Sequence, residues 1–281
     1  MKTKLRLMHL GLLTAALLAG YAPAQNFSAW PVTKIAAGGF HSLFIKSDGT
    51  MWGMGDNSSG QLGLGASVTN VNVPDLLTNS VGLIAAGDNH SLFVSGSGRS
   101  LWAMGANSNG QLGDGTTANH YVPEKIFTVT GSAFVNTIAA GVAHSLFGTR
   151  SITGSGGLYA MGENAWGQLG NGSDTDQHAP VEILTYSAGN PFVTATAGGN
   201  GHSLFIKSDG SLWAMGDNSS GQLGEGSLSR TNKPQEIESS NILWLLLREL
   251  ISVSLSDHLI RLRFSIPILF FWLWAMVNTG S

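Results

Sequence analysis

The sequence predicts an all-β protein of the β-propeller class, and three observations support this. A pattern of Ala-Gly, His-Ser-Leu-Phe, aromatic-x-Met-Gly, Asn and Gly-Gln-Leu-Gly occurs four times in 281 residues, at a period of about 50 residues. The chain contains 38 glycines, many at points where backbones must approach closely. No segment of the repeats has the 3.6-residue apolar spacing of a long amphipathic helix. Short strands in a repeat of this length are typical of one four-stranded blade per copy.

Residues 1–24 have the pattern of an export signal. A basic start precedes the apolar run Leu7–Leu18, and Ala22-Pro23-Ala24 offers small residues for cleavage. The alternative is a membrane anchor, but the apolar run is short for spanning a bilayer. We therefore expect a mature chain that begins at Gln25 and is secreted, periplasmic or held at the cell surface.

Each copy contains two strands joined by a tight turn. In the first copy the apolar run His41–Lys46 is followed by Ser47-Asp48-Gly49-Thr50 and then by Met51–Met54. Asp-Gly between two apolar runs favours a hairpin, because the turn needs a positive φ. The first run carries apolar residues on both faces, so we expect neighbouring sheets to cover both.

A loop with the sequence Asn-x-x-Gly-Gln-Leu-Gly and a weaker strand complete each copy. The weaker strand holds a proline, which removes a ladder donor and suits the first residue of a strand or an outer edge. The prolines are Pro74, Pro123, Pro180 and Pro234. Residues 25–240 are thus predicted to form one repeat domain, with copies at about 33–80, 81–134, 135–190 and 191–238.

The composition changes abruptly after Ser240. Glycine almost vanishes, and the apolar run Ile266–Val277 is about twelve residues long, short for a transmembrane helix. One interpretation is a real hydrophobic tail that anchors the protein or packs on a partner. The other is a fifth repeat translated out of frame, favoured because Leu273-Trp274-Ala275-Met276 copies the Leu101–Met104 motif. Residues 241–281 are therefore treated as an aberrant hydrophobic tail.

These motifs resemble the regulator of chromosome condensation repeat. The resemblance rests on Ala-Gly-x-x-His-Ser-Leu, Leu-Trp-Ala-Met-Gly and Asn-x-x-Gly-Gln-Leu-Gly, and it covers about residues 33–238. It implies a propeller, usually of seven blades, in a family that includes guanine-nucleotide exchange factors, ubiquitin-ligase domains and a secreted bacterial β-lactamase inhibitor. This chain has only four intact copies, so we expect a truncated, exported member of bacterial type. An intermolecular ring and an unusually small propeller are the alternatives.

The recurring histidines and aromatic residues are predicted to be structural. We expect the histidines to hydrogen-bond backbone groups of the neighbouring blade rather than a metal, because equivalent positions on successive blades do not converge. We expect the aromatic residues to form inter-blade core rather than a sugar-binding platform. These positions are His41, His90, His144, His202, Trp52, Trp102, Tyr159 and Trp213.

The sequence points to binding rather than catalysis. We find no paired carboxylates, nucleophile–base pair or phosphate loop, and we expect no cofactor. A net charge of −3 with 11% charged residues lacks the basic field that nucleic-acid binding requires. We expect a secreted, non-catalytic scaffold that binds a macromolecule, most simply a protein, through its loops. The candidate contact residues are Asp56, Asn57, Asn107, Asn164, Trp166, Asp217 and Asn218.

Several alternatives stay open. The chain is a decayed gene product without function in one of them, and a propeller enzyme acting on polysaccharide in another. Membrane association of the tail is a further alternative that we do not favour. Self-association through open blade faces also follows from an incomplete ring, because an open end exposes apolar side chains and unpaired strand edges.

Overall fold

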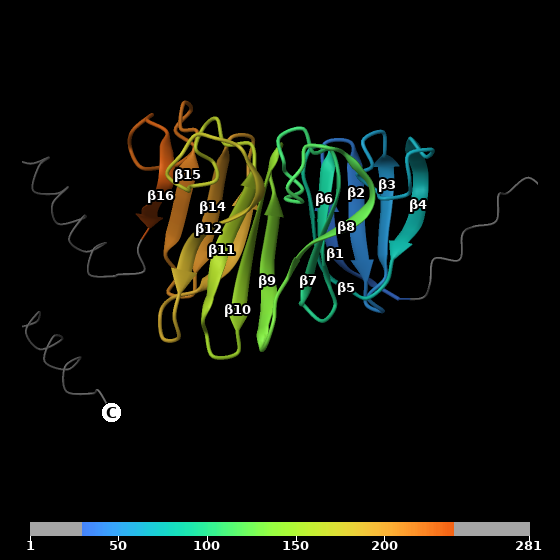
Figure 1. Cartoon of the computed structure of the whole chain (residues 1–281), viewed down its shortest axis with the longest axis horizontal. Helices are drawn as coiled ribbons and strands as arrows, with labels where there is room; N and C mark the ends of the chain where they lie inside the picture. Colours follow the sequence, from blue (N-terminus) through green and yellow to red (C-terminus); the bar gives the residue numbers. More distant parts are fainter. Residues whose placement is uncertain (1–29, 239–281) are drawn as a thin grey trace, which may run out of the picture. The chain divides into compact units, whose positions relative to one another are not determined.

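The computed structural model describes residues 30–238, and these residues form β-strands without a helix (Figure 1). The predicted export signal and the aberrant tail lie outside the described residues. Within residues 30–238 there is no helix of the length and apolar character needed to cross a membrane.

The strands form four antiparallel sheets of four strands each, and every sheet is one continuous piece of the chain. Blade 1 contains β1 (Val32–Ala37), β2 (His41–Lys46), β3 (Met51–Asp56) and β4 (Asn70–Thr78). Blade 2 contains β5 (Val81–Ala86), β6 (His90–Ser95), β7 (Ser100–Gly105) and β8 (His120–Thr128). Blade 3 contains β9 (Ala133–Ala140), β10 (His144–Ser151), β11 (Gly156–Gly162) and β12 (Gln177–Tyr186). Blade 4 contains β13 (Val193–Gly198), β14 (His202–Lys207), β15 (Leu212–Gly216) and β16 (Thr231–Glu238), so the predicted propeller class is confirmed.

The blades follow one another in chain order, and their first strands are the inner ones. Strand β1 contacts β5, β5 contacts β9, and β9 contacts β13. The Ala-Gly ends of these strands meet around a shallow depression of about 200 Å³. Its lining comes from all four blades, so the four inner strands converge at this end of the sheets.

The hydrophobic core is divided into three clusters, one at each junction between blades. Leu92 and Leu101 of blade 2 pack with Phe147 of blade 3, while Phe93 of blade 2 packs with Met51 of blade 1. A third cluster joins blades 3 and 4. Successive residues of β6 thus face opposite neighbours, as the pleat of a strand requires. The face that carries Leu92 is called the forward face, and the face that carries Phe93 is called the backward face.

The predicted hairpin turns form for the expected reason. Asp48 accepts hydrogen bonds at Oδ1 from the Thr50 backbone N at 3.0 Å and from Thr50 Oγ1 at 2.7 Å. Gly49 between them has a φ of 81°, which a side chain would disfavour. The prolines of the weaker strands lie in β4, β8, β12 and β16, at the outer edge of each sheet, where a missing donor is tolerated.

Candidate functional site

A buried histidine, serine and glutamine carbonyl link each blade to the next. The histidine that opens the second strand places Nε2 against the serine Oγ of the following blade, and that serine donates to the glutamine carbonyl of the histidine's own blade. The His–Ser distances are 2.8 Å for His41–Ser91, 2.9 Å for His90–Ser145 and 2.9 Å for His144–Ser203. The serine–carbonyl distances are 2.7 Å for Ser91–Gln61, Ser145–Gln111 and Ser203–Gln168. The predicted partner of the histidines is therefore corrected: it is a hydroxyl group, not a backbone group.

This geometry fixes the tautomer of the histidines. A serine hydroxyl carries one proton, and Ser91 gives it to the Gln61 carbonyl. His41 must therefore donate from Nε2, and its buried Nδ1 has no partner among the described residues. Burial disfavours the charged ring and lowers the pKa of His41 and His144 to about 4 and that of His90 to about 3.

The same geometry excludes a nucleophile at these positions. Ser145 is fully buried, and its proton points at a carbonyl oxygen rather than at the imidazole. A general base must accept the proton of its nucleophile, and here the imidazole is the donor. The His–Ser pairs across the blades therefore have a structural role, in which they link neighbouring blades, rather than a catalytic one.

The glycine of each Ala-Gly pair makes room for the imidazole. A Cβ atom at Gly141 would lie 2.2 Å from His144 Cε1 and 2.5 Å from the Gly199 carbonyl oxygen of the next blade. Gly87 stands in the same relation to His90 and to Gly141. The motif Ala-Gly-x-x-His is thus one packing unit that allows two blades to approach.

The recurring aromatic residues lie on the backward faces and stack on a phenylalanine of the adjacent strand. The ring centroids are 6.4 Å apart for Phe44–Trp52, 5.9 Å for Phe93–Trp102, 5.0 Å for Phe147–Tyr159 and 6.0 Å for Phe205–Trp213. Trp102, Tyr159 and Trp213 pack against the three junction clusters. They are half-buried parts of the core.

The asparagines predicted as contact residues are buried inside their loops, which corrects that part of the predicted site. Asn57, Asn107, Asn164 and Asn218 are at most 1% exposed. In each loop Oδ1 accepts from the leucine backbone of Gly-Gln-Leu-Gly, at 2.8 Å for Leu62 N and 3.0 Å for Leu169 N. Nδ2 donates to carbonyls farther along the loop. These side chains hold the loop closed and do not reach a partner.

The loop glutamines also help to hold the loops closed. Gln61 Nε2 donates to Asp56 Oδ2 at 2.7 Å, and Gln222 Nε2 donates to Asp217 Oδ2 at 2.7 Å. In blade 3 a glutamate, Glu163, takes the place of these aspartates, and the buried Gln168 Nε2 has no partner in the described part of the chain. The pKa of Glu163 is raised by burial and by the charge of Asp176.

The loops at the depression end form an acidic rim. These loops follow the first and third strands of every blade. Together with the end of β3, they carry eight acidic residues and, among the described residues, a single Lys or Arg, Arg230. The acidic residues are Asp56, Asp88, Asp114, Glu163, Asp174, Asp176, Asp217 and Glu225. The loops at the opposite end carry two acidic residues, Asp48 and Asp209, and one basic residue, Arg99.

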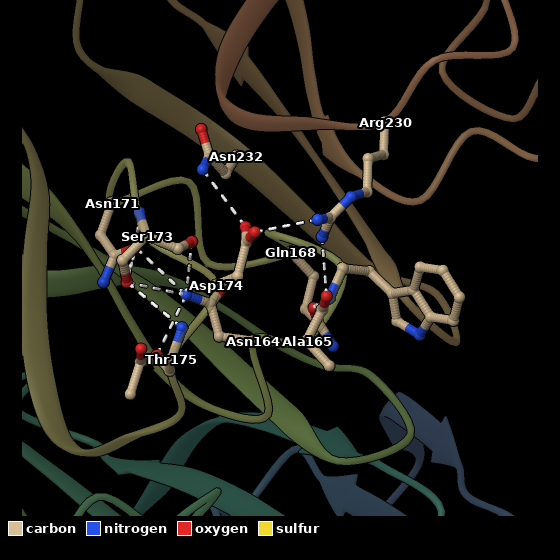
Figure 2. A network of polar contacts seen from close by, with 10 residues as sticks. Asn164, Ala165, Gln168, Asn171, Ser173, Asp174, Thr175, Arg230 and Asn232 are labelled. Atoms are coloured by element: carbon tan, nitrogen blue, oxygen red, sulfur yellow. Dashed lines mark hydrogen bonds and ion pairs between the residues drawn. The ribbon is translucent and has the colours of Figure 1, made fainter.

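Trp166, the predicted apolar contact residue, lies on this rim and is 48% exposed. Phe40, Val142 and Leu228 are further exposed apolar residues in the rim loops. A Cβ atom at Gly201 of blade 4 would lie 2.9 Å from Trp166 Cδ1, so the indole lies against the backbone of the next blade. Figure 2 shows the polar network at this junction, in which Arg230 and Asn232 reach the loop of blade 3. Arg230 donates to the Ala165 carbonyl at 2.8 Å and to Asp174 at 2.9 Å.

Sequence reasoning missed this network and the serines of the junctions. Asp174 and Arg230 are 56 positions apart, and nothing local pairs them. The serines were visible in the His-Ser-Leu-Phe motif, but each bonds the histidine of the preceding blade rather than its own neighbour. An offset of one whole repeat was the available signal for the serines.

Two family profiles described as the regulator of chromosome condensation (RCC1) repeat match this chain. One matches residues 48–94, 100–147, 155–206 and 209–256. The other matches residues 32–61, 83–111 and 193–222.

Three similar proteins are longer than this chain. The ultraviolet-B receptor UVR8 of Arabidopsis thaliana is 32% identical over 222 residues, which are 78% of this chain and 48% of the receptor. The probable E3 ubiquitin-protein ligase HERC4 of Homo sapiens is 31% identical over 221 residues, 77% of this chain and 20% of the ligase. The structure of Prp20p from Saccharomyces cerevisiae, a protein described as binding Gsp1p and histones, has a TM-score of 0.62 at 22% identity and covers 78% of this chain and 53% of Prp20p. The chain spans about half or less of these relatives.

Proposed function

Because the chain belongs to the regulator of chromosome condensation repeat family, we propose that it is an exported, non-catalytic scaffold that binds a basic protein through its acidic rim. Propellers of this family bind proteins, and Prp20p is described as binding Gsp1p and histones. The partner of this chain is defined here by its chemistry alone.

The observation that carries the proposal is the segregation of charge. Eight acidic residues and Arg230 lie on the rim, and Arg230 is already paired with Asp174 at 2.9 Å. A surface of one sign steers a partner of opposite sign and sets its orientation. The closed loops make this surface rigid, so little ordering is needed when a partner binds.

Trp166 supplies the apolar anchor that such an interface needs. Exposed tryptophans surrounded by polar residues are frequent hot spots, because they bury a large area with few rotamers to fix. Ser59 and Ser220 occupy the equivalent loop position in blades 1 and 4. Trp166→Ser therefore removes the anchor while keeping a residue that the loop already accepts.

The binding test compares three tagged chains in medium from the producing cells. Wild type, Trp166→Ser and the control Ile152→Ser are used to capture partners, and affinity for the captured protein is then measured. Ile152 is 79% exposed at the opposite end of the blades. We expect a basic partner that salt releases, and a loss of about 2 kcal/mol or more for Trp166→Ser only. Equal binding by all three chains, or an acidic partner, contradicts the proposal.

Export has its own measurement. We expect the chain to leave the cytoplasm and the intact mass of the exported protein to correspond to a first residue of Gln25. A chain that stays in the cytoplasm at full length contradicts the export part of the proposal and leaves the rim to be tested against cytoplasmic proteins.

A further inference from the structure

The forward face of blade 4 has no blade against it among the described residues. Ile206 is 40% exposed, whereas its equivalents Ile45 and Val94 are 3% and 1% exposed inside junctions. Leu212 is half-buried, while the equivalent Leu101 is fully buried. The fourth junction histidine, His202, has no serine within reach in the described part of the chain.

The backward face of blade 1 has no blade against it within residues 30–238. Ile35 is 82% exposed, whereas the equivalent Ile84 packs into the junction between blades 1 and 2. Phe40, at the turn between β1 and β2, is 77% exposed. The Ser42 side chain has no histidine among residues 30–238, although Ser91, Ser145 and Ser203 each have one.

Blade 1 also has a hollow on this face, at the position where the other blades receive the loop of the preceding blade. In each internal junction the Gly-Gln loop of one blade lies on the following blade. A Cβ atom at Gly60 would be 2.6 Å from Tyr121 Cα, and one at Gly105 would be 3.2 Å from Gln61 Cα. The equivalents of Gly105 and Tyr121 in blade 1 are Gly55 and Asn72.

These two residues line a hollow of about 420 Å³ together with Phe40, Asp56, Asn70 and Val71. Among the described residues nothing covers the matching loop of blade 4, since a Cβ atom at Gly221 would meet only Leu228 of the same loop within 4 Å.

We propose that a second copy of this chain docks head to tail, with its Gly221-Gln222 loop in the hollow of blade 1. The occupant follows from the structure, since the two open faces are the two halves of a junction that the chain builds three times. His202 of one copy then donates to Ser42 of the other, and this serine donates to the Gln222 carbonyl. Ile206 covers the apolar surface around Phe44, as Ile45 does at Phe93.

Such a contact is heterologous, because it joins two different surfaces. The smallest closed ring contains two copies and eight blades, which is within the range of four to eight blades that propellers adopt. A heterologous contact predicts a behaviour that a self-complementary dimer lacks. If one variant has a damaged forward face and another has a damaged backward face, the two variants can still pair through the faces that are intact.

The experiment measures mass by sedimentation velocity for the full chain and two surface variants. Asn72→Trp fills the hollow, and Ile206→Asp places a carboxylate on the forward face. Ile152→Asp, on a turn of blade 3 away from both faces, is the matched control. Circular dichroism and thermal unfolding of each monomer verify that the variants are folded.

We expect wild type and Ile152→Asp to form dimers and each of the other variants to dissociate at concentrations about tenfold higher or more. An equal mixture of Asn72→Trp and Ile206→Asp should recover a one-to-one complex through the intact half of each. A monomeric wild type overturns the proposal, as does assembly that neither variant weakens. A mixture that stays monomeric overturns the head-to-tail geometry. Trp166→Ser distinguishes this inference from the proposed function, because it should lose partner binding while the mass of its assembly stays that of wild type.

Discussion

At the scale of single residues, the hydroxyl proton of the junction serine decides the tautomer of each junction histidine. His144 donates from Nε2, because Ser203 uses its own proton on the Gln168 carbonyl and leaves Oγ to accept. Its pKa is lowered to about 4, chiefly because burial removes the water that would solvate a charged ring. Protonation would leave this hydrogen bond in place, because Nε2 also donates in the charged ring, but it would put a charge on a group that burial keeps from water.

Protonation consequently favours the unfolded chain. The unfolded histidine binds a proton below its ordinary pKa of 6.5, and the folded His144 does so only near pH 4. The stabilisation by His144 is fully present above pH 6.5 and is lost progressively as the pH falls from 6.5 to about 4, by about 1.4 kcal/mol per pH unit. We expect urea unfolding of His144→Gln to show a lower stability at pH 7.5 and a shallower decline in this window than wild type. Parallel declines contradict the assignment, since the carboxylates are common to both proteins.

Glu163 offers a second test at this scale. An aspartate in this position accepts from the loop glutamine in blades 1 and 4, whereas Gln168 Nε2 is left without a partner in the described structure. We expect Glu163→Asp to raise the free energy of unfolding by about 1 kcal/mol, because it satisfies a buried donor. Glu163→Gln, which removes the repulsion from Asp176 without supplying a carboxylate, is the control. An equal gain in both variants assigns the effect to repulsion.

At the scale of strands and blades, stability depends on how closely two sheets approach. Gly141 lies under the His144 ring and against the backbone of Gly199, so a methyl group there meets atoms that have no room to move. We expect Gly141→Ala to lower the free energy of unfolding by about 1–3 kcal/mol through overpacking. Gly82→Ala is the matched control, because its nearest neighbour would be 3.4 Å away. Thermal unfolding that shifts equally in both variants contradicts this account.

At the scale of the whole molecule, the four blades are alike in sequence but not in surroundings. Within residues 30–238, blades 2 and 3 have a junction on both faces, and blades 1 and 4 have one each. In repeat proteins stability is approximately a sum of repeat and interface terms, so the end blades should open more readily. We expect hydrogen exchange of a dilute monomer to be slower in β6 and β10 than in β2 and β14. Uniform protection across the four strands would show that the blades open together.

Much of this architecture is readable from the sequence, because the repeat fixes the copy number and each motif has a local cause. The Asp48-Gly49 turn and the strand that opens at His41 depend on neighbours in the chain. The inner strands were not recognised as strands, since β1 and β5 end in Ala-Ala followed by glycine, and alanine and glycine have low β propensity. Their small side chains are explained only by the close approach of four blades.

The candidate site was less predictable than the fold. The loop asparagines look like exposed polar residues in the sequence, and their burial depends on carbonyls nine to eleven positions away, as for Asn164 with Ser173 and Thr175. Trp166 was predicted as a contact residue because it replaces serine or asparagine in an otherwise regular loop, and it is 48% exposed. The hollow of blade 1 has no sequence signal, because the positions that line it have equivalents in blades whose hollow is filled by the preceding loop.

The displacement of each histidine from its serine by one repeat also affects how such genes change. Every copy encodes the donor for the junction that follows it and the acceptor for the junction that precedes it. Unequal recombination that inserts or deletes a whole copy therefore brings matched halves together wherever the exchange occurs. No compensating substitution is needed, so a lineage can alter its number of repeats in one event. A deletion of part of a copy is different, because it can remove a histidine or a serine and leave the other without its partner at one junction.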